Sequence, residues 1–142
     1  MKTEINLVDG VAFNATSGSG HSVTMDGPPE AGGKNLGVRP MEMLLMGLGG
    51  CSAYDVVTIL RKSRQNVTDL AVKIEAKRAE TDPKVFTSIH LLFKVTGRDL
   101  KNTIVERAIS LSAEKYCSAS IMLGKSANIT HAYEIHSASD SE

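Results

Sequence analysis

The chain has 142 residues, which is the length of one ordinary domain, so we expect a single domain over 1–142 with a disordered tail at 137–142. Its 16 basic and 16 acidic side chains cancel, and it has no Trp, three Phe and three Tyr. This composition argues against nucleic-acid and anionic-membrane partners, because phosphate binding needs excess positive charge and base stacking needs aromatic rings.

The N-terminal segment and the cysteine count indicate a cellular compartment. Residues 1–18 include Glu4 and Asp9 and have no apolar run as long as a signal peptide, so we expect a cytoplasmic protein. In a reducing cytoplasm, two cysteines do not favour a permanent structural disulfide. They leave three alternatives, namely two buried thiols, part of a metal site, or a redox-active pair.

Residues 1–38 contain the short β-prone segments INLV, VAFNAT and HSVTM, followed by the Gly- and Pro-rich loop DGPPEAGGKNLG. This pattern predicts a small β-meander and a loop. The longest predicted helix begins at Pro40, which suits a first helical turn, and runs to a basic end at 61–64.

The middle of this helix has no charged residue between Met43 and Tyr54. A helix that is apolar all round must be buried all round, and twelve residues are too few to cross a bilayer. Gly47, Gly49 and Gly50 indicate that another backbone approaches closely there, since glycine is otherwise unfavourable inside a helix. We therefore expect a dimer in which the partner chain helps to cover this helix.

The second half of the chain predicts strands, a helix and a last strand. Segments 69–80 and 87–97 alternate apolar and polar residues around the turn TDPK, which predicts a β-hairpin. Asp99 is the expected N-cap of a helix over 100–116, with a break near CSAS, a helical turn over 121–126 and a strand over 128–137. This order of elements is typical of an α+β fold.

The candidate reactive residues are the two cysteines rather than the histidines. His131 and His136 are five residues apart on a predicted strand and would face opposite ways, so we expect no histidine metal site. Cys51 has two open interpretations, a small core residue or a reactive thiol. Cys117 lies at the predicted helix break, where free backbone N–H groups can stabilise a thiolate. Spacing alone does not show that the two thiols meet.

The segment RPMEMLLMGLGGCSAYDVV, followed much later by EKYC, resembles the signature of the OsmC/Ohr family and in particular its YhfA-like branch. The resemblance implies an intertwined α+β homodimer, with antiparallel sheets around a long buried central helix. It also implies that an organic hydroperoxide oxidises Cys51 to a sulfenic acid, which Cys117 resolves as a disulfide. An external thiol or dithiol would supply the electrons, with no bound cofactor or metal.

The chain departs from the family pattern beside the first cysteine. Other members have an acidic residue directly after the helix-opening proline, whereas this chain has Met41 there and Glu42 next, and Arg39 is its first arginine. Glu42 and Cys51 are nine residues apart, about half a turn round a straight helix and roughly 13.5 Å along it. Our hypothesis is that Arg39 and Glu42 assist Cys51 from the partner subunit or from a bent segment.

Other polar residues near the cysteines have weaker catalytic interpretations. Asp55 follows Cys51 by one helical turn and would oppose thiolate formation if it lies close. We assign Ser52 and Tyr54 to packing or pocket lining, since neither has an evident base beside it. Glu114 and Tyr116 fit a solvated helix end as well as they fit a role in positioning Cys117.

Three functions follow from these observations. The first is a peroxidase for organic hydroperoxides. The second is a non-catalytic protein that binds a lipid-like or other hydrophobic small molecule in a dimer-interface pocket. The third is a redox-sensing dimer that forms the disulfide and stops.

Overall fold

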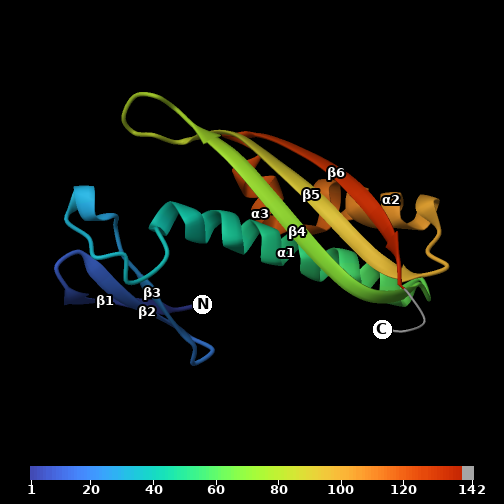
Figure 1. The fold of residues 1–142 in the computed structure, drawn as a ribbon, viewed down its shortest axis with the longest axis horizontal. Helices are drawn as coiled ribbons and strands as arrows, with labels where there is room; N and C mark the ends of the chain where they lie inside the picture. The colour runs from blue at the N-terminus through green and yellow to red at the C-terminus, as the bar shows by residue number, and fades with distance from the viewer. Residues whose placement is uncertain (139–142) are drawn as a thin grey trace. The chain divides into compact units, whose positions relative to one another are not determined.

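The computed structural model describes residues 1–138 and divides the chain into two compact units, Met1–Met46 and Gly47–Glu142 (Figure 1). Each unit is described by itself below, and the single domain stays a prediction. Of the predicted disordered tail, residues 139–142 lie outside the described residues. Ser137, where that tail was expected to begin, is the last residue of strand β6.

The first unit contains the predicted meander. Its three strands pair antiparallel in chain order, with Ile5 opposite Ala15 and Phe13 opposite Met25. All seven residues of the first strand are exposed, including apolar Ile5 and Leu7. The elements are β1 (Thr3–Asp9), β2 (Ala12–Ser17), β3 (Ser22–Met25) and a 3₁₀ turn η1 (Pro29–Ala31).

A buried carboxylate organises the loop after β3. Asp26 is 3 % exposed and accepts hydrogen bonds from the backbone N–H groups of Gly27 (2.7 Å), Lys34 (3.0 Å) and Leu36 (3.1 Å). Burial raises the pKa of Asp26, but these three donors and the charge of Arg39 outweigh it and lower the pKa overall. This residue is not among those predicted from the sequence.

Helix α1 (Pro40–Lys62) begins at the predicted proline. At its start, the Glu42 carboxylate accepts a hydrogen bond from the Arg39 backbone N–H at 2.8 Å. An acidic residue at the third helical position that binds the N–H of the residue before the helix is half of a capping box. The basic pair Arg61 and Lys62 at the other end complements the helix dipole.

Helix α1 buries one side of its surface within a single chain. By length and composition alone, the whole of this helix could cross a membrane. Only part of its apolar surface is covered within the chain, and Leu44, Met46 and Tyr54 are exposed. The expected burial on every side is therefore not met by one chain. The buried residues are Leu48, Gly49, Ser52, Val56 and Leu60.

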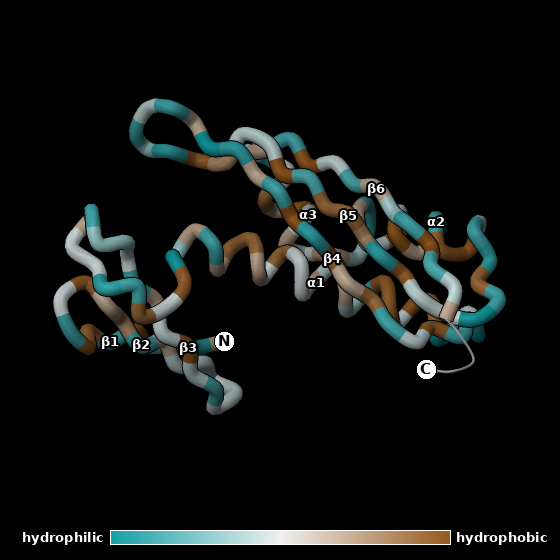
Figure 2. Tube along the Cα trace, in the orientation of Figure 1, coloured by the Kyte–Doolittle hydropathy of each residue, from teal (hydrophilic) through white to brown (hydrophobic). Residues whose placement is uncertain are grey.

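The second unit contains a three-stranded sheet in the order β4-β5-β6. β4 (Asn66–Arg78) and β5 (Phe86–Arg98) form the predicted antiparallel hairpin, whereas β6 (Asn128–Ser137) runs parallel to β5. Figure 2 shows hydrophilic and hydrophobic residues alternating along β4 and β5. The predicted inward positions of β5 are all buried, namely Ile89, Leu91, Phe93 and Val95.

Three helices lie along one face of this sheet, α1 from Gly47 onward together with α2 (Asn102–Leu111) and α3 (Ser118–Leu123) (Figure 1). A Cβ atom added at Gly49 would lie 2.8 Å from Ile74 Cδ1, so α1 packs tightly on β4 at this glycine. The α+β architecture with a long helix is thus confirmed, with a mixed second sheet. The intertwined homodimer stays a prediction.

The start of α2 corrects one expectation. Asp99 is not its N-cap, because the chain takes a left-handed conformation there (φ 52°) and the helix begins three residues later, after Lys101. Lys101 makes no side-chain cap. The helix buries Val105, Ala108 and Ile109.

Candidate active site

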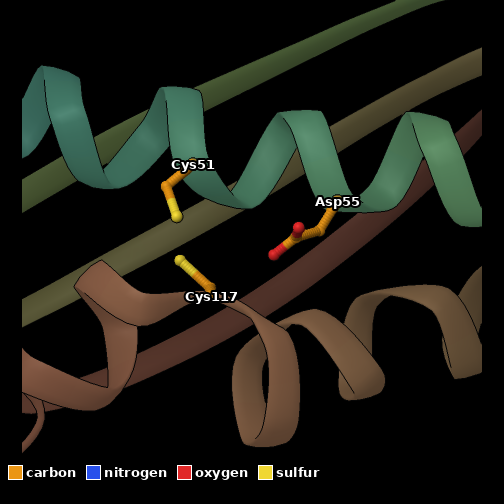
Figure 3. A group of neighbouring side chains, drawn as sticks. All are labelled: Cys51, Asp55 and Cys117. Atoms are coloured by element: carbon orange, nitrogen blue, oxygen red, sulfur yellow. The ribbon is translucent and has the colours of Figure 1, made fainter.

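The two cysteines meet inside the second unit. Cys51 is half-buried in the middle of α1, and Cys117 is fully buried between α2 and α3. Both are free thiols, and their Sγ atoms lie within 4.8 Å of each other and of an Asp55 carboxylate oxygen (Figure 3). The sequence left open whether the thiols come together, and the fold brings them together.

A break in the helical backbone places Cys117 opposite Cys51. Helix α2 continues into one turn of π-helix, η2 (Ser112–Tyr116), which ends where the Cys117 N–H donates to the Ser112 carbonyl at 2.8 Å. Cys117 then adopts an extended conformation and becomes the N-cap of α3, because its Sγ accepts a hydrogen bond from the Ser120 N–H at 3.4 Å. The predicted break, with backbone donors at the thiol, is confirmed.

Buried serine hydroxyls connect the thiols to the carboxylate. The Ser112 hydroxyl donates to Asp55 Oδ2 at 3.2 Å and to the Ser52 carbonyl at 3.4 Å. The Ser52 hydroxyl lies 3.3 Å from Cys117 Sγ in hydrogen-bond geometry. From the sequence, Ser52 was expected to pack or to line a pocket, and Ser112 and Ser120 were not expected at the site. The signal that could have marked them is the serine-rich stretch SLSAEKYCSAS around Cys117.

The surroundings of Cys51 oppose its ionisation. Burial is the largest influence and raises the pKa of the Cys51 thiol, and the neighbouring Cys117 and the Asp55 charge raise it further. The main opposing influence is the backbone N–H of Ala119, which lowers the pKa. The prediction that Asp55 would oppose thiolate formation is confirmed.

Arg39 and Glu42 belong to a polar cluster in the first unit. The Arg39 guanidinium donates through Nη1 to Asn35 Oδ1 at 2.9 Å and to the Gly37 carbonyl at 3.2 Å, while Glu42 binds the Arg39 N–H. Both residues therefore shape the entry to α1. Their role toward Cys51 stays a prediction.

The remaining candidates are at the surface. Tyr54 is 71 % exposed, and Glu114 and Tyr116 are exposed on the π-helical turn. The Lys115 ammonium lies 5.3 Å from the centroid of the Tyr116 ring, a cation–π contact at the protein surface. Glu114 and Tyr116 fit the solvated helix end that the sequence allowed. Tyr54, expected to pack or to line a pocket, lines a cavity between α1 and β4.

A cavity of about 490 Å³ reaches the carboxylate side of this site. It lies between the second half of α1 and the end of α2, with Asp55 in its wall. Apolar Ile59 and Leu111 line it together with Lys62. A cavity of this size and mixed lining suits a small organic molecule with a polar group.

Comparison with known proteins places this arrangement in one family. The sequence profile of the OsmC-like protein family matches residues 32–132. Protein YhfA of Escherichia coli K12 is 53 % identical over 135 residues, which cover 95 % of this chain and 98 % of that protein. A hypothetical protein from Aquifex aeolicus has a crystal structure with a TM-score of 0.85, at 31 % identity over 97 % of each chain.

A more distant structure shares the fold alone. The organic hydroperoxide resistance protein OsmC from Legionella pneumophila is 17 % identical, with a TM-score of 0.71 over 94 % of this chain and 97 % of that one. The profile match covers both cysteines and the helices that carry them. The chain belongs to the OsmC-like protein family.

Proposed function

We propose that this protein is a thiol-dependent peroxidase that reduces organic hydroperoxides through Cys51 and Cys117. The observation that carries the proposal is the approach of the two sulfur atoms to within 4.8 Å in the reduced protein. Membership of the OsmC-like family and the fold shared with an organic hydroperoxide resistance protein support a redox role.

The proposed catalytic cycle has three steps. The Cys51 thiolate attacks the distal oxygen of ROOH, the O–O bond breaks, and the alkoxide takes a proton and leaves as ROH, so that Cys51 becomes a sulfenic acid. The Cys117 thiol then attacks the Cys51 sulfur, the S–O bond breaks, and water leaves as the disulfide forms. An external dithiol returns two electrons and two protons by thiol–disulfide exchange.

The resting site favours the second step over the first. Resolution needs only the neighbouring Cys117, which the N-cap position of α3 holds in place. Peroxide attack needs the Cys51 thiolate, and burial, Cys117 and Asp55 all raise the pKa of that thiol. We therefore include Arg39 and Glu42 in the proposal as groups that a partner chain or a bent segment brings to Cys51.

We also propose that the functional unit is a homodimer, as is typical of the OsmC/Ohr family. Leu44, Met46 and Tyr54 of α1 are exposed in the single chain. Cβ atoms added at Gly47 and Gly50 would meet nothing within 4 Å, which leaves open space for the close approach of a second chain. A cytoplasmic location stays part of the proposal.

One observation favours a second candidate function, binding of a hydrophobic small molecule. The first unit has a cavity of about 330 Å³ with an almost wholly apolar wall that includes Ile5, Val11 and Phe13. In this alternative the cysteines only pack, and a bound ligand survives the change of Cys51 to serine. A redox sensor is the third candidate and would form the disulfide once per peroxide.

The test compares consumption of cumene hydroperoxide and hydrogen peroxide by the reduced protein in the presence of dithiothreitol. We expect turnover that prefers the organic peroxide, no turnover for Cys51→Ser, and at most one sulfenic acid per chain for Cys117→Ser in the absence of added thiol. One equivalent of peroxide consumed without further turnover would identify the sensor. No consumption, together with a ligand that copurifies with Cys51→Ser, would identify the binder.

A further inference from the structure

The carboxylate beside the two thiols takes no part in the cycle proposed above. Asp55 lies within 4.8 Å of both sulfur atoms, and its negative charge disfavours the Cys51 thiolate that attacks a peroxide. The fold nevertheless holds it there, since Ser112, a residue 1 % exposed, donates a hydrogen bond to its Oδ2. A bound cation would remove this conflict, because it stabilises two thiolates and a carboxylate side by side.

We propose that Cys51, Asp55 and Cys117 of the reduced protein form a binding site for a thiophilic divalent cation of the zinc class. Among residues 1–138 this is the group of three such side chains whose ligand atoms all lie within 4.8 Å of one another (Figure 3). Two thiolates and one carboxylate are ligands that Zn²⁺ takes, and three protein ligands leave its fourth position for water. Metal binding by these residues does not require that the protein be a peroxidase, although it uses the same thiols.

The spacing of the ligand atoms is close to that of a tetrahedral site. Zinc–sulfur bonds of about 2.3 Å and zinc–oxygen bonds of about 2.1 Å place neighbouring ligand atoms roughly 3.6 to 3.8 Å apart. The three ligand atoms lie at most 4.8 Å apart, so a pair has to close by at most about 1.2 Å. Rotation of half-buried Cys51 and Asp55 side chains covers a movement of this size.

Each of the three ligands already has a hydrogen-bond donor behind it. The Ala119 N–H binds the Cys51 sulfur, the Ser120 N–H binds the Cys117 sulfur at 3.4 Å, and the Ser112 hydroxyl binds Asp55 at 3.2 Å. Such outer donors orient metal ligands and partly offset their charge. Each of the three proposed ligands thus has an outer hydrogen-bond partner of the kind that metal sites use.

Metal binding and disulfide formation exclude each other at this site. Binding of the ion displaces one proton from each thiol, so two protons are released per metal and both sulfurs are occupied. A metal-bound Cys51 is withheld from peroxides, and a disulfide has no thiolate to offer a metal. This consequence rests on the proposed function: a zinc-class ion would reversibly inhibit the peroxidase activity of the reduced protein.

The test titrates the reduced full chain with Cd²⁺ in the absence of oxygen and follows the ultraviolet sulfur-to-cadmium charge-transfer absorption. We expect one ion per chain, two protons released, and no binding by Cys51→Ser, by Cys117→Ser or by the oxidised protein. Asp55→Asn should weaken binding at least about tenfold, because the loss of even a residue that only hydrogen-bonds to a metal ligand usually costs this much. Asp69→Asn, an exposed aspartate of the same unit, is the matched control and should bind as the unaltered protein does.

Two results of the titration would overturn the site. One is the absence of charge-transfer absorption in a reduced protein that still consumes peroxide, which would leave the peroxidase proposal standing. The other is equal affinity in Asp55→Asn and Asp69→Asn. Because Asp55→Asn can also disturb folding, ¹¹³Cd nuclear magnetic resonance of the unaltered chain gives an independent answer. A resonance typical of two sulfurs with oxygen supports the site, and one typical of sulfur-only coordination contradicts it.

Discussion

Strands β1 and β5 both have regularly placed apolar residues, but the exposure of these residues differs between the two units. In β5 the inward residues, including Phe93, are at most 3 % exposed beneath the helices of the second unit. In β1 every residue is exposed, and Ile5, Leu7 and Val8 remain more than half accessible. The second unit thus encloses its own core and its thiol pair, whereas the first unit leaves apolar surface that a second chain can cover.

The two phenylalanines Phe93 and Phe13 provide the largest test of this difference. Phe93→Ala should lower the free energy of unfolding by about 3 to 5 kcal/mol, because it leaves a cavity in a closed core. Phe13 is 37 % exposed on β2, so Phe13→Ala should cost well under half of that at low protein concentration. Urea unfolding measured at two protein concentrations checks both values.

The same two variants also test the proposed dimer when their stability is measured at different protein concentrations. If a partner chain covers the first unit, the unaltered protein gains stability with concentration, and the loss caused by Phe13→Ala grows with it. The loss caused by Phe93→Ala should stay nearly constant. Equal losses for the two variants at low concentration would show that the two units do not differ as described.

The same contrast explains what could be predicted from the sequence. The β5 pattern and the start of α1 at Pro40 depend on local periodicity and on local preferences for the first helical turn, and both predictions were confirmed. The parallel pairing of β6 with β5 depends on a connection through α2 and α3, which local patterns do not encode. Asp99 failed as an N-cap because a left-handed residue moved the helix start to Asn102.

In the candidate site, too, local patterns predicted some residues and missed others. The motif around Cys51 and Cys117 marked both thiols, and the four-residue spacing marked Asp55 as a neighbour of Cys51. The serine hydroxyl that orients Asp55 comes from position 112, on another helix, and no spacing relates it to α1. Contacts across elements of this kind depend on packing, which a single sequence does not display.

Ser112 gives the second prediction, which concerns the enclosed unit. Ser112→Ala removes two hydrogen bonds from a residue 1 % exposed and should lower the free energy of unfolding by about 1 to 3 kcal/mol. Ser63→Ala changes an exposed serine at the end of α1 and should stay within about 0.5 kcal/mol. Thermal and urea unfolding measure both, and similar values for the two variants would contradict the buried network.

The third prediction concerns the charge of Asp55. Asp55→Asn should lower the pKa of Cys51, because it removes a nearby negative charge that disfavours the thiolate. Below that pKa, each unit of lowering multiplies the thiolate fraction, and hence the rate of alkylation by iodoacetamide, by about ten. The measurement is the pH profile of Cys51 alkylation in a Cys117→Ser background, with Asp69→Asn as control. An unchanged profile would mean that Asp55 does not act on Cys51.

The smallest effect is expected in the first unit, from Asp26. Its pKa in the folded protein is lower than the ordinary 3.8, so its stabilising contribution is complete at neutral pH and is lost as the pH falls through the folded pKa. Asp26→Asn should therefore flatten the decline in stability between about pH 5 and about pH 2. Urea unfolding across this range measures the decline, with Asp69→Asn again as the exposed control. A variant that declines as steeply as the unaltered protein would place the acid-sensitive carboxylates elsewhere, and the loop after β3 would then depend on its backbone hydrogen bonds alone.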